Sequence, residues 1–416
     1  MKIFNPFVIS LFIIIPFVFS CKNESNTSEN EEISRLKVGM WRTVLKVENE
    51  KELPFIFELQ SDTTLVIHNG VERIEVSDIV INGDSITIQA PVFEGVFKGK
   101  MISSELIKGD FIKPSLDRVV PFTMAFGEDK RFTISKKPKA NISGNWETMF
   151  SPNTEEDSYI GKGTFNQEGG KVTGTFRTTT GDYRFLEGVM EGDSLKLSTF
   201  DGAHAFLFEA KVTDSAMAGF FYSGNHWKEP FVAKRNESFE LPSANSLTYL
   251  KEGYDRLAFS FPNNEGELIS LEDDRFKDKV VVVQIMGTWC PNCLDETKYY
   301  LEYLKKHKNK DLEFVALSFE YAKTEEKALM AINRLIEVLE VPYPVLLAQY
   351  GTTNKKKANE KLPMLNHVLS YPTSMFIDKK GKVRKIHTGF NGPATGEKYV
   401  VFKTEFESFM TELLEE

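Results

Sequence analysis

Cysteine is scarce in this sequence, which has only three among its 416 residues: Cys21, Cys290 and Cys293. Secreted domains that are held together by disulfides carry several pairs of cysteines. The chain therefore excludes a disulfide-scaffold fold, and burial of apolar side chains must stabilise it. A chain of this length can form two or three separate hydrophobic cores.

An excess of positive charge is also lacking. The sequence has 51 Lys and Arg against 60 Asp and Glu, a net charge of -9, and the basic residues are scattered among the acidic ones. Nucleic-acid-binding proteins concentrate basic residues on one face. The composition therefore argues against nucleic acid as a partner and fits ordinary solubility.

Residues 1–20 are typical of a secretory signal peptide. They carry one positive charge near the start, an apolar centre and the small Ser20 at the end. The alternative is an uncleaved membrane anchor, for which the apolar run is short and is broken by Pro16. Both interpretations predict export of the chain.

The segment Val18-Phe19-Ser20-Cys21 resembles a bacterial lipobox, in which the cysteine is lipidated and becomes the new N-terminus. Residues 21–35 that follow are polar and have too little apolar surface to fold. The resemblance implies a protein attached to a bacterial membrane by a lipid on Cys21, with the folded part facing the periplasm.

Residues 36–240 consist of short alternating apolar segments separated by Gly, Asn and Asp turns, a pattern that predicts an all-β region. The pattern repeats after 105 to 109 residues, and the corresponding pairs are Trp41 and Trp146, Gly83 and Gly192, and Pro121 and Pro230. We therefore expect two tandem modules, residues 36–138 and 139–240, with about eight strands each.

Eight antiparallel strands joined by short hairpins can remove their exposed edges by closing into a barrel. The Gly-x-Trp near the start of each module resembles the start of lipocalin-like and related calycin barrels, and we expect Trp41 and Trp146 to plug the barrel floors. His68, His204 and His226 stand singly, so neither module is predicted to hold a metal.

Residues 241–416 alternate predicted strands and helices, as in an α/β domain. A buried strand is expected over 279–286, a helix from 291 to about 307, and a last helix from about 396 to 414. Between these, a strand and a helix cover 312–340, another strand covers 343–349, and a hairpin covers 373–389.

Cys290 and Cys293 stand where this buried strand gives way to a helix. A helix that begins near Cys290 places the first sulfur beside free N–H groups and the positive end of the helix dipole, which stabilise a thiolate. Pro291 suits the first turn, because its missing N–H would have no partner there. Cys293 lies one turn further and can resolve a mixed disulfide. The pair is therefore predicted to be a redox centre.

A cysteine pair with this spacing can have two other roles. A structural zinc site needs four ligands, but the sequence has no second Cys pair, and His307, His367 and His387 are scattered. A permanent disulfide between Cys290 and Cys293 would close a very small loop and constrain the unfolded chain little. No metal is therefore expected.

The motifs GTWCPNC and YPTSMFIDKKGKV, in this order and spacing, resemble the thioredoxin fold of the TlpA/ResA-like thiol-disulfide oxidoreductases, over roughly residues 250–416. The resemblance implies that Cys290 is the nucleophile and Cys293 the resolving cysteine of a redox-active disulfide. The residues that it places in the surrounding shell are Trp289, Pro291, Asn292, Tyr371 and Pro372. Pro372 is expected to follow a cis bond, with the backbone of Tyr371 facing the disulfide.

Glu296 matches a glutamate that handles protons in ResA-like proteins. An acid in the first turns of a helix can instead have no role beyond a favourable interaction with the helix dipole. Thioredoxin itself has a buried acid six residues before the first cysteine, where this chain has Gln284. An amide cannot take the proton of Cys293, so Glu296 or water must do so. Residues 351–369 are expected to form a helical insertion beside the site.

The resemblance thus implies an exported, membrane-tethered enzyme that reduces disulfides of exported proteins, with apocytochromes c among the candidates. A membrane electron carrier would recharge the dithiol, and no cofactor is expected. The main alternative is a ligand-binding lipoprotein that uses its tandem β modules and has an accessory thioredoxin-like domain. A purely structural lipoprotein is disfavoured, because it has no use for a free dithiol.

Overall fold

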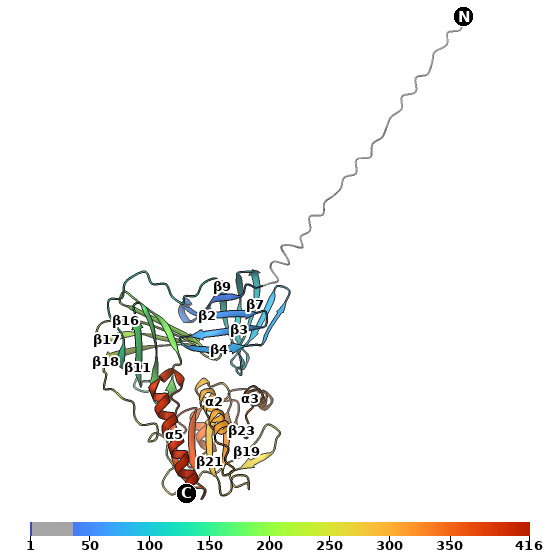
Figure 1. The fold of residues 1–416 in the computed structure, drawn as a ribbon, viewed down its shortest axis with the longest axis vertical. Coiled ribbons are helices and arrows are strands. Elements are labelled where there is room, and N and C mark those ends of the chain that lie inside the picture. Colours follow the sequence, from blue (N-terminus) through green and yellow to red (C-terminus); the bar gives the residue numbers. More distant parts are fainter. Residues whose placement is uncertain (2–35) are drawn as a thin grey trace.

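The computed structural model describes Met1 and residues 36–416. The predicted signal peptide and the lipidation site Cys21 lie outside these residues and stay predictions. Within the described part, no helix is both long enough and apolar enough to cross a membrane. The predicted fold class is confirmed: two barrel-like antiparallel sheets precede an α/β domain (Figure 1).

The first module is one antiparallel sheet in the order β4-β3-β2-β1-β9-β8-β7-β6-β5. Its strands are β1 (Gly39–Lys46), β2 (Glu52–Ser61), β3 (Thr64–Asn69), β4 (Glu72–Val76), β5 (Ile79–Asn82), β6 (Ser85–Gln89), β7 (Val96–Ser103), β8 (Leu106–Lys113) and β9 (Arg118–Phe126). In the described residues β4 and β5 do not pair, so this sheet curls but stays open at that seam.

The second module closes. Its order is β11-β10-β18-β17-β16-β15-β14-β12-β13, and β11 also pairs with β12, which completes a ring of eight strands. The strands are β10 (Gly144–Phe150), β11 (Tyr159–Glu168), β12 (Lys171–Thr178), β13 (Gly181–Asp182), β14 (Leu186–Glu191), β15 (Ser194–Phe200), β16 (Ala205–Val212), β17 (Ala216–Ser223) and β18 (Trp227–Arg235). Each module thus has nine strands rather than about eight.

Corresponding residues of the repeat make the same contacts. The indole N–H groups of Trp41 and Trp146 each donate a 2.9 Å hydrogen bond to the carbonyl four residues earlier, and both side chains are buried in the module cores. Gly83 and Gly192 hold the matching β5–β6 and β14–β15 turns with φ of 59° and 62°, which favours glycine. The two modules are therefore copies of one fold.

The α/β domain is built around β21 (Val280–Met286), which is buried on both faces. The sheet order is β23-β22-β21-β24-β25, with β22 parallel to β21 and β24 antiparallel to it. The other elements are β19 (Ser260–Pro262), β20 (Leu268–Ser270), α2 (Pro291–Lys306), β22 (Leu312–Phe319), α3 (Glu325–Leu339), β23 (Val345–Gln349), α4 (Lys355–Lys361), β24 (Thr373–Ile377), β25 (Val383–Thr388) and α5 (Glu397–Glu415).

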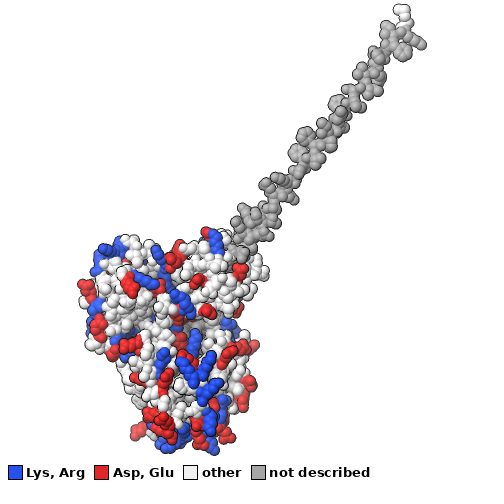
Figure 2. All heavy atoms as spheres, viewed as in Figure 1, with Lys and Arg blue, Asp and Glu red and all other residues white. Residues whose placement is uncertain are grey.

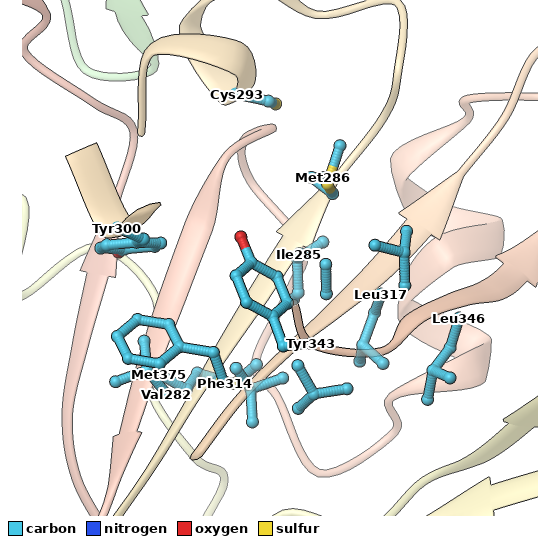
Figure 3. Packing of buried hydrophobic residues seen from close by; sticks show 14 of the residues in the cluster. Val282, Ile285, Met286, Cys293, Tyr300, Phe314, Leu317, Tyr343, Leu346 and Met375 are labelled. Atoms are coloured by element: carbon cyan, nitrogen blue, oxygen red, sulfur yellow. The ribbon is translucent and has the colours of Figure 1, made fainter. Parts of the chain in front are cut away.

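Figure 3 shows how the core of the α/β domain positions one of the two cysteines. Ile285 and Leu317 pack side by side on adjacent strands, Met286 ends β21, and Cys293 lies beyond that end at the start of α2. The carboxyl ends of the parallel strands therefore point at the dithiol.

The three units share their cores. Phe200 of β15 packs inside the first module and stacks on Phe55, with 4.4 Å between ring centroids. Val92 and Phe93 of the first module pack into the core of the α/β domain. Outside these contacts, Figure 2 shows Lys and Arg interspersed with Asp and Glu on the visible face. The modules therefore form one packed body with the α/β domain.

Candidate redox site

Cys290 is the N-cap of α2, as the sequence predicted. Its Sγ accepts a hydrogen bond from the backbone N–H of Cys293 at 3.2 Å, and Pro291 occupies the first helical position. A sulfur at this position faces the unpaired N–H groups of the first turn, which favour a negative charge. The helix begins here because Cys290 N–H bonds to the carbonyl of Gly287 at 3.1 Å and closes the turn after β21.

Both cysteines are free thiols in the structure, so it holds the reduced form of the pair. Cys290 is 6% exposed and Cys293 is fully buried. Burial raises the pKa of Cys293 well above its ordinary value, and its hydrogen bond with Cys290 adds to the rise. Cys293 therefore needs a nearby group to take its proton before it can act as a nucleophile.

The loop before β24 lies against the first cysteine. The Tyr371–Pro372 peptide bond is cis, in agreement with the expectation from the sequence, and the thiol of Cys290 donates to the carbonyl of Tyr371 at 3.4 Å. Trp289 covers the neighbouring side: its ring packs edge-on against Tyr371 at 5.6 Å, and its indole N–H bonds to Phe319 O at 2.9 Å.

Gln284 and Glu296 meet beside Cys293. The Gln284 side-chain amide donates to Glu296 Oε2 at 2.8 Å and to the carbonyl of Cys293 at 3.4 Å. Glu296 is fully buried, and this burial raises its pKa to about 7. A carboxyl group with a pKa near 7 can both accept and release a proton at neutral pH.

Part of the second module also borders the dithiol, which the sequence did not reveal. The turn between β12 and β13, residues 178–182, lies on the loops around Cys290. The carbonyl of Thr180 accepts from Ser370 Oγ at 2.8 Å, and the carbonyl of Asp182 accepts from Asn292 Nδ2 at 3.2 Å. No local motif marks this turn, because its partners lie 110 and 190 residues away in the chain.

A buried arginine next to this turn joins all three units. Arg184 pairs with Glu72 of the first module at 3.1 Å, with Asp201 at 3.3 Å, and with Asp295 of α2. Burial by itself would lower the pKa of Arg184, but the surrounding carboxylates, Asp295 foremost, raise it above its ordinary value. Local sequence patterns cannot reveal this cluster, because its members come from three separate units.

The predicted helical insertion within 351–369 is present as α4, capped by the side chain of Asn354. The charge of Cys290 acts on the pKa of Lys355, the exposed first residue of α4. The insertion therefore brings an ammonium group into electrostatic range of the first cysteine. As for metals, no group of three or more His, Cys, Asp or Glu with suitable geometry occurs in the described part of the chain.

Residues 251–400 match the Redoxin family. The thioredoxin-like protein YneN of Bacillus subtilis is 31% identical over 140 residues, which cover 34% of this chain and 73% of that protein. The thiol-disulfide oxidoreductase ResA of Bacillus thuringiensis is 32% identical over 119 residues, which cover 29% of this chain and 59% of ResA.

Among solved structures, a thiol-disulfide oxidoreductase from Bacteroides fragilis matches 36% of this chain and 99% of its own, with 20% identity and a TM-score of 0.26. The family match falls on the domain that carries Cys290 and Cys293, and the two β modules lie outside it. Through residues 251–400, the chain belongs to the thioredoxin-like thiol-disulfide oxidoreductases of the Redoxin family.

Proposed function

We propose that the protein is an exported, lipid-anchored reductase that uses the Cys290–Cys293 dithiol to reduce disulfides of exported proteins. The observation that carries this proposal is the position of Cys290. Its sulfur caps α2, lies within hydrogen-bonding distance of the Cys293 N–H, and touches the carbonyl that precedes the cis proline. The anchor rests on the lipobox resemblance at Cys21.

The geometry supports a two-step exchange. The Cys290 thiolate attacks one sulfur of the substrate disulfide, forming a mixed disulfide and releasing the other sulfur as a thiolate. Cys293 then loses its proton and attacks Cys290 Sγ, which releases the second substrate thiolate and leaves a Cys290–Cys293 disulfide. Two electrons pass to the substrate, and Glu296 accepts the proton of Cys293.

Reduction rather than oxidation is proposed from the resemblance of GTWCPNC and YPTSMFIDKKGKV to the TlpA/ResA-like family. A reductant in an oxidising compartment must be recharged, so we propose a membrane electron carrier as the donor. Apocytochromes c are candidate substrates, because their cysteines must be reduced before haem is attached.

The alternative function, ligand binding by the β modules, finds less support. The interior of each module is filled by aromatic side chains, among them Trp41 and Phe57 in the first and Trp146 and Phe208 in the second. We therefore assign the modules a role at the dithiol, where residues 178–182 and Arg184 meet the α/β domain.

The test is capture of substrates in the host compartment. In a Cys293→Ser variant the mixed disulfide on Cys290 cannot be resolved, so we expect disulfide-linked adducts on non-reducing gels that dithiothreitol releases. Cys290→Ser is the matched control and should capture nothing. Equal capture by both variants, or a dithiol that does not titrate reversibly as a two-electron couple in a glutathione buffer, would contradict the proposal.

A further inference from the structure

A cavity of about 550 Å³ lies where the three units meet. The first module contributes Lys113 and Arg118 to its wall, the second contributes Tyr183 and Phe206, and the α/β domain contributes Trp289 and Tyr321. Its volume falls within the range of sites that bind small molecules. The cavity exists only because the modules and the α/β domain pack together.

The cavity adjoins the dithiol through Trp289. This residue directly precedes Cys290, and its ring lies 5.8 Å from Tyr321 on the cavity side and 5.6 Å from Tyr371 beside the sulfur. Cys290 itself is not part of the cavity wall. A molecule in the cavity that also reaches the sulfur must therefore be elongated, as a polypeptide segment is.

The wall carries two cations that form no ion pair with any described residue. Lys113 is 9% exposed, and its ammonium donates one hydrogen bond, to the carbonyl of Ala203 at 3.0 Å. Burial lowers the pKa of Lys113 to about 8, and the charge of Arg118 adds to the lowering. Burial also lowers the pKa of Arg118. A negative charge brought close to Lys113 and Arg118 would stabilise their charged forms and offset this effect of burial.

Four acids lie near these cations or line the cavity, and three of them are already engaged. Asp201, whose charge acts on Lys113, pairs with Arg184 at 3.3 Å. Glu94 accepts from the Tyr321 hydroxyl at 2.9 Å and from the Ser115 N–H at 3.1 Å. Glu229 accepts from Ser151 at 2.7 Å and from Tyr159 at 2.6 Å. Asp157 is exposed at the cavity rim. Lys113 and Arg118 therefore remain available to a carboxylate that enters from outside.

Aromatic rings form much of the remaining wall, among them Tyr183, Phe206, Trp227, Trp289 and Tyr321. Such rings bind apolar side chains and peptide planes, and the unpaired cations select negative charge. We propose that the cavity binds an acidic peptide segment that flanks the substrate disulfide, so that the β modules select which disulfides reach Cys290. This inference rests on the proposed reductase function and names its substrate class.

The experiment compares matched peptide substrates. The full-length protein is given peptides with one disulfide in which a Glu stands one to four residues from the half-cystine, and the same peptides with Gln in its place. We expect kcat/KM to be about tenfold higher for the best Glu peptide than for its Gln partner. Arg118→Gln and Lys113→Gln should each reduce this ratio towards one, whereas Arg73→Gln, an exposed arginine of the first module, should leave it unchanged.

Three results would contradict the inference, and they differ in what they say of the proposed function. Equal kcat/KM for Glu and Gln peptides, while the neutral 2-hydroxyethyl disulfide is reduced, overturns the inference and leaves the proposed function standing. Failure to reduce any of these disulfides overturns both. Inhibition by free glutarate as strong as that by an acidic peptide without cysteine overturns the peptide assignment in favour of a small anion.

Discussion

At the scale of single residues, the proposed exchange depends on a buried proton acceptor. Cys293 is fully buried with a raised pKa, and Glu296 lies close enough for its charge to raise that pKa further. The amide of Gln284 bonds to one Glu296 oxygen and cannot itself take a proton. This arrangement gives Glu296 the position from which it can receive the proton of Cys293.

Glu296→Gln should therefore slow the second step of the exchange. Glutamine has the same shape and can still accept from Gln284, so the fold is expected to persist. In the wild type the rate of mixed-disulfide resolution should rise as pH increases through about 7, where Glu296 becomes a carboxylate, and in the variant this rise should vanish. Stopped-flow kinetics between pH 5 and 9 measure this, and identical profiles would remove Glu296 from the mechanism.

The raised pKa of Glu296 also predicts how the free energy of unfolding depends on pH. The pKa of Glu296 is about 7 in the folded protein against an ordinary 4.5, so the folded state holds a proton that the unfolded state has released. The free energy of unfolding should therefore fall as pH rises from 4.5 to 7, by about 3 kcal/mol from this group. Urea unfolding should show this fall in the wild type and lack it in Glu296→Gln; an equal fall in both proteins would contradict the shift.

At the scale of elements, the turn between β12 and β13 packs against the start of α2 and the loop before the cis proline. Gly181 has φ of 148°, and a Cβ added to it would lie 2.2 Å from Asn292 Nδ2. Residues 178–182 approach the active-site helix this closely only because no side chain stands at Gly181. The same turn also accepts a hydrogen bond from Ser370, in the loop before the cis proline.

Gly181→Ala should push this turn away from Asn292 and expose the first cysteine. We expect the reduced variant to react with iodoacetamide several-fold faster at Cys290 than the wild type does. Gly169→Ala is the matched control, because Gly169 also has a positive φ of 61° in the second module, and an added Cβ there would meet nothing within 4 Å. Equal alkylation rates in Gly181→Ala and the wild type would show that the turn does not limit access.

At the scale of the whole molecule, packing and charge hold the three units together. Phe200 joins the cores of the two modules, and Arg184 pairs with a carboxylate from each unit: Glu72, Asp201 and Asp295. Burial raises the pKa of Asp201, but His204 and Arg184 outweigh that effect and lower it to about 2. The contribution of Asp201 to stability is therefore present above pH 3.8 and is lost as pH falls through 2.

Arg184→Met should destabilise the protein by about 3 to 5 kcal/mol at pH 7, since it leaves buried carboxylates without their cation. Lower pH lets these groups take up protons in the folded variant, so the deficit should shrink towards pH 4.5. Guanidinium unfolding at several pH values measures both effects, and Arg73→Met, at an exposed arginine, is the control. A deficit that does not depend on pH would contradict this account of the cluster.

Local patterns in the sequence predicted much of this architecture. Alternation predicted strands, the 105-to-109-residue offset predicted two copies, and Cys290 before Pro291 predicted the start of a helix, because each depends on residues close together in the chain. Short-range patterns do not set how far a sheet curls, so they left open that the second module closes while the first stays open between β4 and β5.

The sequence by itself determined the order of the domains and the place of Cys290 and Cys293 at the start of a helix, and its resemblance to a known family predicted Glu296 and Pro372 beside them. Only the tertiary structure decided that a turn of the second module lies against Asn292, that Arg184 joins three units, and that Lys113 and Arg118 face a cavity beside Trp289. The reason is physical: these contacts join residues more than a hundred positions apart, and their geometry exists only once separate cores have packed.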